Sequence, residues 1–244
     1  MNSVEPLCRV LEWDSGFFGF RIARARVSHL TAATAARLLA ESEAAALRCL
    51  YFLAEADDIE TIQLLEAGGF GLKDLRLTLS RPVPAIAIPG APDIRPATAA
   101  DLPALRRIAR TSHGSSRFYA DPNFPRDRCA GLYEAWIANS YDAGFADAVL
   151  IGESGGEVAG YITCSMADSA RGRIGLFAVD AAARGRGLGR RLIEQSLAWF
   201  AAHGAGEAVT VTQGKNLGAV RVYERRGFTA ASVQLWYHRW FPTE

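Results

Sequence analysis

One glycine- and arginine-rich stretch decides the fold: Ala183-Arg184-Gly185-Arg186-Gly187-Leu188-Gly189-Arg190-Arg191. A strand-like apolar run, residues 173–179, comes just before it, and an amphipathic helix pattern follows it. Glycines at the start of a helix let its free backbone N–H groups approach an anion closely. Arginines on both sides add charge-assisted contacts that suit phosphate. The stretch therefore predicts a binding loop for a diphosphate.

The spacing of the glycines limits which diphosphate ligand fits this loop. A P-loop needs Gly-x-x-x-x-Gly-Lys-Ser/Thr, and the sequence contains no Lys-Ser or Lys-Thr pair. The dinucleotide-binding pattern Gly-x-Gly-x-x-Gly does not fit either, because the glycines are Gly185, Gly187 and Gly189. The pattern that is present is Arg184-x-x-Gly187-x-Gly189. A glycine-rich helix start with surface arginines remains the alternative interpretation.

A second motif lies near the end of the sequence. Residues 207–212 have the β-branched pattern of a strand, and residues 213–216 form a polar turn. A short helix pattern, 217–226, follows and ends at a glycine, as helices commonly do. The motif is Asn216-x-x-Ala219-x-x-x-Tyr223-Glu224-x-x-Gly227-Phe228. Taken singly, Asn216 is equally explained as a helix cap and Tyr223 as a core aromatic residue.

In this order, the two motifs resemble the GCN5-related N-acetyltransferases. The resemblance implies an α/β (α+β) fold, in which helices flank a mixed, mostly antiparallel twisted sheet. It implies that the arginine–glycine loop holds the pyrophosphate of acetyl-CoA and that the preceding strand binds the pantetheine arm through its backbone. Tyr223 would lie near the thioester sulfur. The expected acetyl-CoA contacts are Phe177, Ala178, Val179, Arg184, Gly185, Arg186, Gly187, Leu188, Gly189, Asn216 and Tyr223.

The bulk composition argues against several classes of function. Of the 244 residues, 50% are apolar and 22% are charged, as in folded globular proteins. The formal net charge of +1 gives no field that favours nucleic acid or an anionic membrane. No apolar run reaches membrane-spanning length, and the first residues lack the order of a secretion signal, so a cytoplasmic location is expected.

The cysteines give no indication of a metal site or of disulfides. Cys8, Cys49, Cys129 and Cys164 are scattered, without Cys-x-x-Cys or Cys/His ligand spacing. Reduced thiols are expected, and no metal cofactor is predicted.

A proline-rich segment divides the chain. Residues 82–92 contain four prolines and predict a stiff, extended linker. It separates a smaller N-terminal α/β domain on the substrate side, 1–81, from an acetyltransferase domain, 93–244. In the first domain the patterns predict strands at 21–27, 49–54 and 72–79, and helices at 32–47 (capped by Thr31) and 59–67. In the second they predict strands at 93–97, 146–153, 158–166 and 173–179, and helices from Leu102 and at 128–139.

A second resemblance covers nearly the whole chain. The opening Leu11-Glu12-Trp13-Asp14-Ser15-Gly16-Phe17-Phe18-Gly19-Phe20, the tripeptide Ser116-Arg117-Phe118 and Tyr133-x-x-Trp136-Ile137 resemble the TDP-fucosamine (TDP-4-amino-4,6-dideoxygalactose) N-acetyltransferases. In those enzymes a carboxylate after a Gly-Phe pair is proposed as a water-mediated base. Asp74 occupies that position here, where the family residue is a glutamate; a surface aspartate beside Lys73 is the alternative.

The same resemblance suggests residues for the acceptor. Arg117 is the candidate for the diphosphate of a sugar nucleotide, or for orienting the sugar, with a solvated loop arginine as the alternative. Tyr119 and Phe17, with Trp13 and Phe124, are candidates for a stacking wall, although such aromatic residues more often belong to a core. His113 and His203 are assigned to a loop and a helix end.

The chemistry of acetyl transfer assigns the remaining roles. The amine must be neutral, the tetrahedral oxyanion needs a donor, and the departing thiolate needs a proton. A backbone N–H of residues 177–179 is the expected oxyanion donor. Tyr223 is the expected general acid, because a free phenol titrates near ~10 and a free thiol near ~8.5.

The predicted function is direct transfer of acetyl from acetyl-CoA to the amino group of a nucleotide-diphosphate amino sugar, similar to dTDP-4-amino-4,6-dideoxygalactose. One alternative keeps the chemistry and changes the acceptor to another small amine, an amino acid or a protein N-terminus. The other alternative is a non-catalytic acyl-CoA-binding module. The sequence leaves the oligomeric state open, with a homodimer as one alternative.

Overall fold

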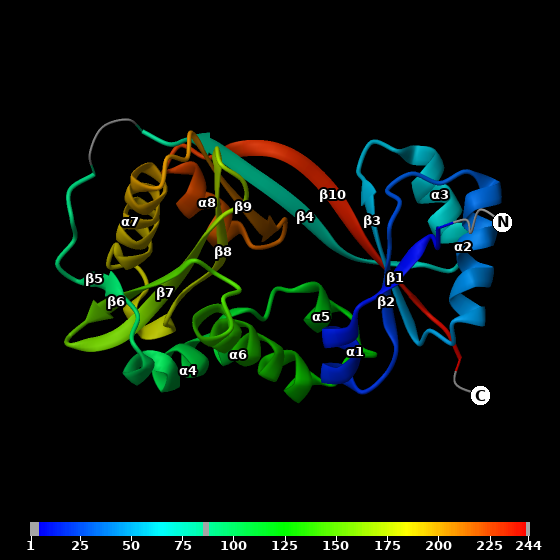
Figure 1. Cartoon of the computed structure of the whole chain (residues 1–244), viewed down its shortest axis with the longest axis horizontal. Helices are drawn as coiled ribbons and strands as arrows, with labels where there is room; N and C mark the ends of the chain where they lie inside the picture. The colour runs from blue at the N-terminus through cyan, green and yellow to red at the C-terminus, as the bar shows by residue number, and fades with distance from the viewer. Residues whose placement is uncertain (1–4, 85–87, 243–244) are drawn as a thin grey trace. The chain divides into compact units, whose positions relative to one another are not determined.

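The computed structural model describes residues 5–84 and 88–242 (Figure 1). The chain divides into two units, and neither is a single continuous segment. The first unit consists of Met1–Arg76, Ala120–Phe124 and Val233–Glu244, and the second of Leu77–Tyr119 and Pro125–Ser232. The predicted boundaries 1–81, 82–92 and 93–244 stay a prediction, and residues 85–87 of that linker lie outside the described residues.

In the first unit the strand order is β1-β2-β3-β10, followed by residues 71–76 of β4. The bounds of the first four strands are Cys8–Val10, Ile22–Ala25, Cys49–Glu55 and Thr229–Trp240, and β10 enters this unit at Val233. β2 and β3 are parallel, whereas β1 pairs antiparallel with β2, and β10 with β3. Helices α2 (Ala32–Ala44) and α3 (Ile59–Ala67) cover one face of this sheet (Figure 1). Apolar side chains of the two helices, such as Leu38 of α2 and Leu65 of α3, share a core with alternate residues of β3. These β3 residues are Leu50, Phe52 and Ala54.

Two caps fix the starts of these helices. The hydroxyl of Thr31 accepts a hydrogen bond from the backbone N–H of Thr34, which confirms the cap predicted for α2. Asp58 accepts a hydrogen bond from the backbone N–H of Thr61 and caps α3. Each cap typically contributes about 1 kcal/mol to the stability of a helix.

The second unit has the strand order β4-β9-β8-β7-β6-β5. Its helices α4 (Leu102–Ser112) and α7 (Leu188–Ala202) cover opposite faces of the sheet (Figure 1). A Cβ on Gly160 would meet Leu192 of α7, while the next residue, Tyr161, hydrogen-bonds to His113 at the end of α4. The strands of this unit are residues 77–82 of β4 (Gly71–Pro82), β5 (Ile94–Pro96), β6 (Ala148–Ser154), β7 (Glu157–Met166), β8 (Arg171–Val179) and β9 (Glu207–Gln213). Its other helices are α5 (Arg117–Ala120), whose last residue is counted with the first unit, α6 (Arg126–Asp142) and α8 (Leu217–Glu224).

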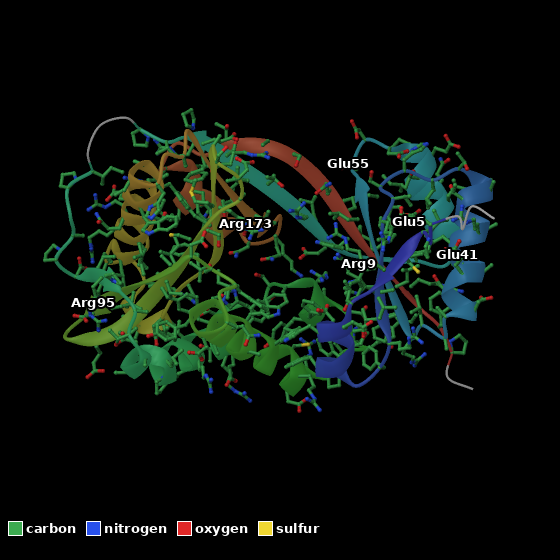
Figure 2. The ribbon with its side chains drawn as sticks, viewed as in Figure 1. Glu5, Arg9, Glu41, Glu55, Arg95 and Arg173 are labelled. Carbon is green, nitrogen blue, oxygen red and sulfur yellow. The ribbon has the colours of Figure 1, made fainter. Side chains whose placement is uncertain are left out.

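An ion-pair cluster ties the edge strand β5 to the rest of the second unit. Arg95, labelled in Figure 2, pairs with Asp101 at 2.8 Å and with Glu153 at 2.8 Å. The buried Asp101 also accepts hydrogen bonds from the backbone and hydroxyl of Thr98. Hydrogen bonds from Arg95 outweigh burial, so the pKa of Asp101 lies well below its usual range and the cluster stays ionised at neutral pH.

The middle of β8 is irregular on both sides. Against β7, Ile162 pairs with Phe177 and Cys164 with Ile174, so two residues of β8 oppose Thr163 alone, as in a β-bulge. The hydroxyl of Thr163 accepts a hydrogen bond of 2.8 Å from the backbone N–H of Leu176 within this bulge. Against β9, parallel pairing ends at Ile174 and Thr210. In the described part of the chain, residues 177–179 therefore pair with β7 only, and their other edge is open.

Most of the predicted elements are present, with ends that move by a few residues. β8 and β9 pair in parallel, whereas β5, β6, β7 and β8 pair antiparallel, so the sheet is mixed, as the resemblance implies. The sequence patterns did not indicate β1, the helix α1 (Glu12–Phe18) or the twelve-residue strand β10. The first five residues of β10 are all exposed, so this strand lacks the alternation of apolar and polar residues that identifies a half-buried strand.

Candidate active site

The arginine–glycine loop leads into α7 through two residues with left-handed backbone conformations. Gly185 and Gly187 both have φ of 78°, and Gly187 is the N-cap of the helix. No side chain in the described part of the chain caps this helix, so its first backbone N–H groups are available to an anion. The sequence assigned an anion to this position, and the backbone geometry is suited to one.

The third glycine of the loop allows the helix to approach β8 closely. A Cβ on Gly189 would lie 3.1 Å from the ring of Phe177 and 3.5 Å from Val179. The start of α7 therefore lies directly against the strand that the sequence assigns to the pantetheine arm. The two predicted acetyl-CoA contacts, loop and strand, are brought together in one unit.

The arginines of the loop differ in their surroundings. Arg184 donates from Nε to the carbonyl of Val179 at 3.1 Å, which ties the loop to the end of β8. Arg191 forms an ion pair of 2.7 Å with Asp93 and donates to the carbonyl of Arg186 at 3.2 Å. Arg186 itself is exposed and forms no ion pair within the described residues. Two arginines therefore hold the loop in shape, and the side chain of the third is exposed.

Tyr223 lies where β8 and β9 separate. Its phenolic oxygen is 3.3 Å from the hydroxyl of Thr210, the last β9 residue paired with β8, and its ring centroid is 5.7 Å from that of Phe177. Burial raises the pKa of Tyr223, and the hydrogen bond from Thr210 opposes the shift only in part. The phenol is thus protonated throughout the physiological range, beside the open edge of β8.

Asn216 caps α8. Its side-chain oxygen accepts a hydrogen bond of 3.3 Å from the backbone N–H of Ala219, so the capping interpretation is confirmed. The cap uses the oxygen only. The amide nitrogen has no hydrogen-bond partner among the described residues and remains available to a ligand.

The residues predicted for the base and for the acceptor fall in both units. Asp74 is a buried residue of β4 in the first unit, which does not fit a surface aspartate. Phe17, on α1 of the same unit, stacks on Trp13 with ring centroids 5.1 Å apart. Arg117 and Tyr119 lie on α5, where the Arg117 guanidinium covers the ring of Phe118 at 4.3 Å. Phe124 is buried in the aromatic core of the first unit, and His203 ends α7 as expected.

The comparisons with known proteins agree with this arrangement. A family model described as the acetyltransferase (GNAT) family matches residues 105–228. That span holds the open β8 edge, the arginine–glycine loop and Tyr223 and covers half of the chain. The chain belongs to the GNAT family of acetyltransferases.

Relatives of this GNAT chain include proteins of sugar metabolism. It is 29% identical over 238 residues to the dTDP-fucosamine acetyltransferase of Escherichia coli O6:H1, covering 97% of this chain and 98% of that one. It is 28% identical over 148 residues to the spore coat polysaccharide biosynthesis protein SpsD of Bacillus subtilis, covering 61% and 50%. A solved GCN5-related N-acetyltransferase from Sphaerobacter thermophilus has the same fold, with a TM-score of 0.63, 15% identity and coverage of 96% and 76%.

The GNAT chain is thus an acetyl-CoA-dependent N-acetyltransferase, a conclusion that confirms the predicted fold and enzyme class. Among residues 5–84 and 88–242, no three His, Cys, Asp or Glu side chains are grouped so that they could hold a metal ion. In the same residues, no helix is long and apolar enough to cross a membrane. The four cysteines are free thiols.

A histidine–tyrosine pair that the sequence did not indicate lies on the α4 face of the sheet. His113 Nε2 is 2.8 Å from the hydroxyl of Tyr161, and its ring stacks on Tyr133 with centroids 4.3 Å apart. Burial lowers the pKa of His113 to about 4 and raises that of Tyr161, so both groups are neutral at pH 7. The two residues are far apart in the sequence, and no local sequence motif indicates that they are in contact.

A second unexpected cluster surrounds Asp121 in the first unit. This fully buried carboxylate accepts hydrogen bonds of 2.8 Å from both His238 and Trp240, and the ammonium of Lys73 lies 3.6 Å away. Burial alone would raise the pKa of Asp121, but these hydrogen bonds and one from the Asn123 backbone hold it well below its usual range. The cluster fixes the segment Ala120–Phe124, which begins at the last residue of α5, to the last strand.

Proposed function

We propose that this acetyltransferase acts on the amino group of an amino sugar carried by a nucleoside diphosphate, similar to dTDP-4-amino-4,6-dideoxygalactose. The observation that carries the proposal is the likeness over 97% of the chain to an enzyme named dTDP-fucosamine acetyltransferase. The likeness includes the first unit as well as the GNAT domain, so it extends beyond the part that all acetyl-CoA-dependent relatives need. Since acetyl-CoA is drawn from the cytoplasm, the proposal also assigns the reaction to that compartment.

The proposed reaction starts with attack of the neutral amine on the thioester carbon of acetyl-CoA. The helix start at Leu188 and Gly189 holds the pyrophosphate, and the open edge of residues 177–179 holds the pantetheine arm. A backbone N–H of this edge donates to the oxyanion of the tetrahedral intermediate. Holding both reactants at attack distance supplies several kcal/mol of the barrier.

Collapse of the intermediate breaks the C–S bond, and in the proposed mechanism Tyr223 gives its phenolic proton to the leaving thiolate. Burial raises the pKa of this phenol, which weakens it as an acid. The same loss of water raises the proton affinity of a thiolate that forms beside it. Because the pKa values of the phenol and of the thiol rise together, the proton can still pass from the phenol to the thiolate. The attacking nitrogen loses its proton to a base, for which Asp74 acting through water is the proposed candidate.

A panel of acceptors tests this proposal. The protein is incubated with acetyl-CoA and, in parallel, a dTDP-4-amino sugar, its epimer at C4, a UDP-linked amino sugar, free amino acids and a peptide with a free N-terminus. Release of CoA thiol and the mass of each product are followed. The proposal expects the highest kcat/KM for a nucleotide-linked amino sugar. Turnover only of amino acids or of the peptide would overturn the acceptor class and leave the acetyltransferase assignment intact.

A further inference from the structure

The two units repeat one succession of secondary-structure elements at a constant spacing in the sequence. Strand β3 covers Cys49–Glu55 and β9 covers Glu207–Gln213, so each residue number of β9 is 158 higher. The same offset of 158 relates β4 to β10, and both strands have 12 residues. Helices α2 and α7 end 158 residues apart, and α3 and α8 begin 158 residues apart. We call residues 30–83 the first copy and residues 188–241 the second copy.

Backbone hydrogen bonds recur at the same offset. The N–H of Phe228 donates to the carbonyl of Tyr223 at 3.2 Å, and the N–H of Phe70 donates to the carbonyl of Leu65 at 2.9 Å. The other matching donors and acceptors are Gly69 to Glu66 and Gly227 to Glu224, Ala46 to Glu43 and Gly204 to Ala201, and Leu47 to Ser42 and Ala205 to Phe200. Such identical turns are more than a general strand–helix–strand connection requires.

The last strand of each copy lies in the other unit. In the first unit β10 pairs antiparallel with β3, and in the second unit β4 is the neighbour of β9. The N–H of Phe241 donates to the carbonyl of Arg48 at 3.1 Å, and the N–H of Val83 donates to that of Gly206 at 2.9 Å. Both the donors and the acceptors of these two bonds are again 158 residues apart. The two copies have therefore exchanged their last strands.

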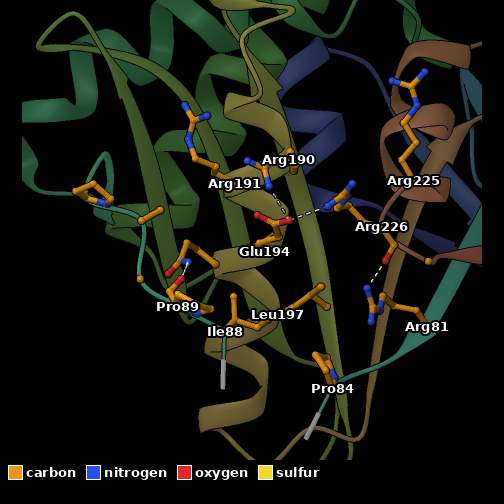
Figure 3. A pocket seen from close by; sticks show the side chains of 15 residues that line it. Arg81, Pro84, Ile88, Pro89, Arg190, Arg191, Glu194, Leu197, Arg225 and Arg226 are labelled. Carbon is orange, nitrogen blue, oxygen red and sulfur yellow. Dashed lines mark hydrogen bonds and ion pairs between the residues drawn. The ribbon is translucent and has the colours of Figure 1, made fainter. Parts of the chain in front are cut away.

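An arginine on each exchanged strand contacts the turn that ends a helix. Arg81 of β4 donates to the carbonyl of Arg226, beside Gly227 (Figure 3). Arg239 of β10, 158 residues further on, donates to the carbonyl of Gly69 at 3.3 Å. A Cβ on Gly227 would meet the guanidinium of Arg81, and a Cβ on Gly69 would meet that of Arg239. Equivalent side chains thus hold the exchanged strand in both units.

The chain leading into the two copies differs where acetyl-CoA would bind. Ile22 of β2 pairs with Cys49, and Arg171 of β8 pairs with Glu207, so the offset of this strand is 149 instead of 158. The chain before the first copy is therefore nine residues shorter. The missing residues fall opposite residues 175–187, which contain the open edge and most of the arginine–glycine loop.

The helix start that remains in the first copy is closed by its own side chains. The N–H of Leu30 donates to the hydroxyl of the buried Thr61 at 2.8 Å. The equivalent residues of the second copy are Leu188 and Ala219, and alanine has no hydroxyl to accept this bond. Leu30 and Leu188 are each 1% exposed, as expected of equivalent positions. The same N–H is thus used internally in the first copy and available to an anion in the second.

A negative charge also stands beside the closed helix start. Asp58 caps α3 in the first copy as Asn216 caps α8 in the second. Asp58 forms an ion pair of 2.7 Å with His29, which takes the place of Gly187. Hydrogen bonds from Thr61 and His29 lower the pKa of Asp58 to about 2, so its carboxylate is ionised at neutral pH. This charge would repel a diphosphate.

We propose that the first copy is a degenerate repeat of the acetyl-CoA-binding half of the enzyme, which has lost its own ligand and serves as a framework. Leu65 takes the place of Tyr223, so the first copy also lacks the proposed acid. It keeps the turns and the strand β4, which lies beside β9 in the second unit. The proposal rests on the proposed use of residues 177–189 for acetyl-CoA. It requires that the chain bind one acetyl-CoA and that position 219 carry no hydroxyl.

Titration calorimetry of the whole protein with CoA tests both requirements, and no acceptor is needed. The wild-type protein should bind one CoA per chain. Ala219→Thr places a hydroxyl where the first copy has Thr61, so it competes for the Leu188 N–H, and the Kd for CoA should rise about 10-fold. Thr61→Ala leaves the N–H of Leu30 without its acceptor. This variant should lower Tm by about 2–4 °C and leave Kd unchanged.

Val220→Thr is the matched control, because it adds a hydroxyl to the same helix one residue further on, and its Kd should not change. Binding of two CoA molecules per chain would overturn the loss of the first site, and this measurement needs no variant. An unchanged Kd in Ala219→Thr would overturn the equivalence of the two helix starts. Absence of CoA binding in the wild type would instead overturn the acetyl-CoA assignment, so the two failures are distinguishable.

Discussion

The phenolic oxygen of Tyr223 lies 3.3 Å from the hydroxyl of Thr210, at the last residue pair that joins β8 to β9. Beyond this pair the strands separate, and β8 presents an open edge as far as Val179. One threonine thus marks the end of the parallel pairing and also orients the tyrosine. The position of the proposed acid is fixed by sheet geometry rather than by a mobile loop.

Replacement of Tyr223 by Phe tests its role as acid. The variant keeps the ring packing against Phe177 and Phe228 but cannot give a proton. We expect kcat to fall by roughly 10²-fold to 10⁴-fold, with the affinity for acetyl-CoA changed by less than about twofold. Stopped assays and calorimetry measure the two quantities. Tyr141→Phe on α6 is the control, and an equal loss of kcat there would contradict the assignment.

Replacement of Thr210 by Val tests whether the hydrogen bond orients the phenol. The side chains have similar shapes, but valine offers no hydroxyl at this fully buried site. We expect a loss of stability of about 1 kcal/mol and a fall in kcat of about 3-fold to 10-fold. Thr210→Ser should restore most of the rate, which a purely structural role would not require. Full activity of the valine variant would contradict the proposed role of this hydrogen bond in orienting the phenol.

Alanine at Gly187 or at Gly189 of the loop should weaken acetyl-CoA binding. At Gly187 the left-handed backbone conformation costs an alanine about 1–2 kcal/mol. At Gly189 the added methyl would lie 3.1 Å from the Phe177 ring and push the helix start away from β8. We expect the KM for acetyl-CoA to rise by about tenfold or more in each variant. Gly16→Ala, in open space on α1, should leave KM unchanged, and an unaltered KM at Gly189→Ala would be the contrary result.

His113 should make folding stability depend on mildly acidic pH. Its pKa is about 4 in the folded protein and about 6.5 when unfolded, so the unfolded chain binds more protons between these values. The contribution of the neutral, buried His113 to the free energy of unfolding is therefore complete above about pH 6.5. As the pH falls toward about 4, the free energy of unfolding decreases by on the order of 1–3 kcal/mol. Urea unfolding of the wild type and of His113→Gln measures it. Parallel pH profiles for the two proteins would exclude this origin.

Local patterns predicted the part of the site that depends on local structure. The arginine–glycine loop follows a strand and begins a helix within one short segment, so this local structure could be predicted from spacing alone, while the contacts assigned to its residues stay a prediction. The order of strand, loop, helix, strand and tyrosine helix was enough to predict the family, because those elements are consecutive in the second unit.

The contacts that the sequence did not indicate join residues far apart in the chain. His113 and Tyr161 are 48 residues apart, and Asp121 and His238 are 117 apart. No periodicity or motif records such pairs, because they depend on how whole elements pack. Strand β10 was missed for a related reason: it pairs with β3, which is distant in the sequence, and five of its twelve residues are exposed.

The antiparallel pairing of β10 with β3 also has a consequence for biosynthesis. Residues 234–240 supply the neighbour of residues 49–55, so the ribosome makes β3 long before it makes that neighbour. Until then the nascent chain carries a strand of six buried positions with one unsatisfied edge, which is a hazard for aggregation. The unit that is translated first is therefore the one that completes its folding last, and this chain should depend on chaperones during its synthesis.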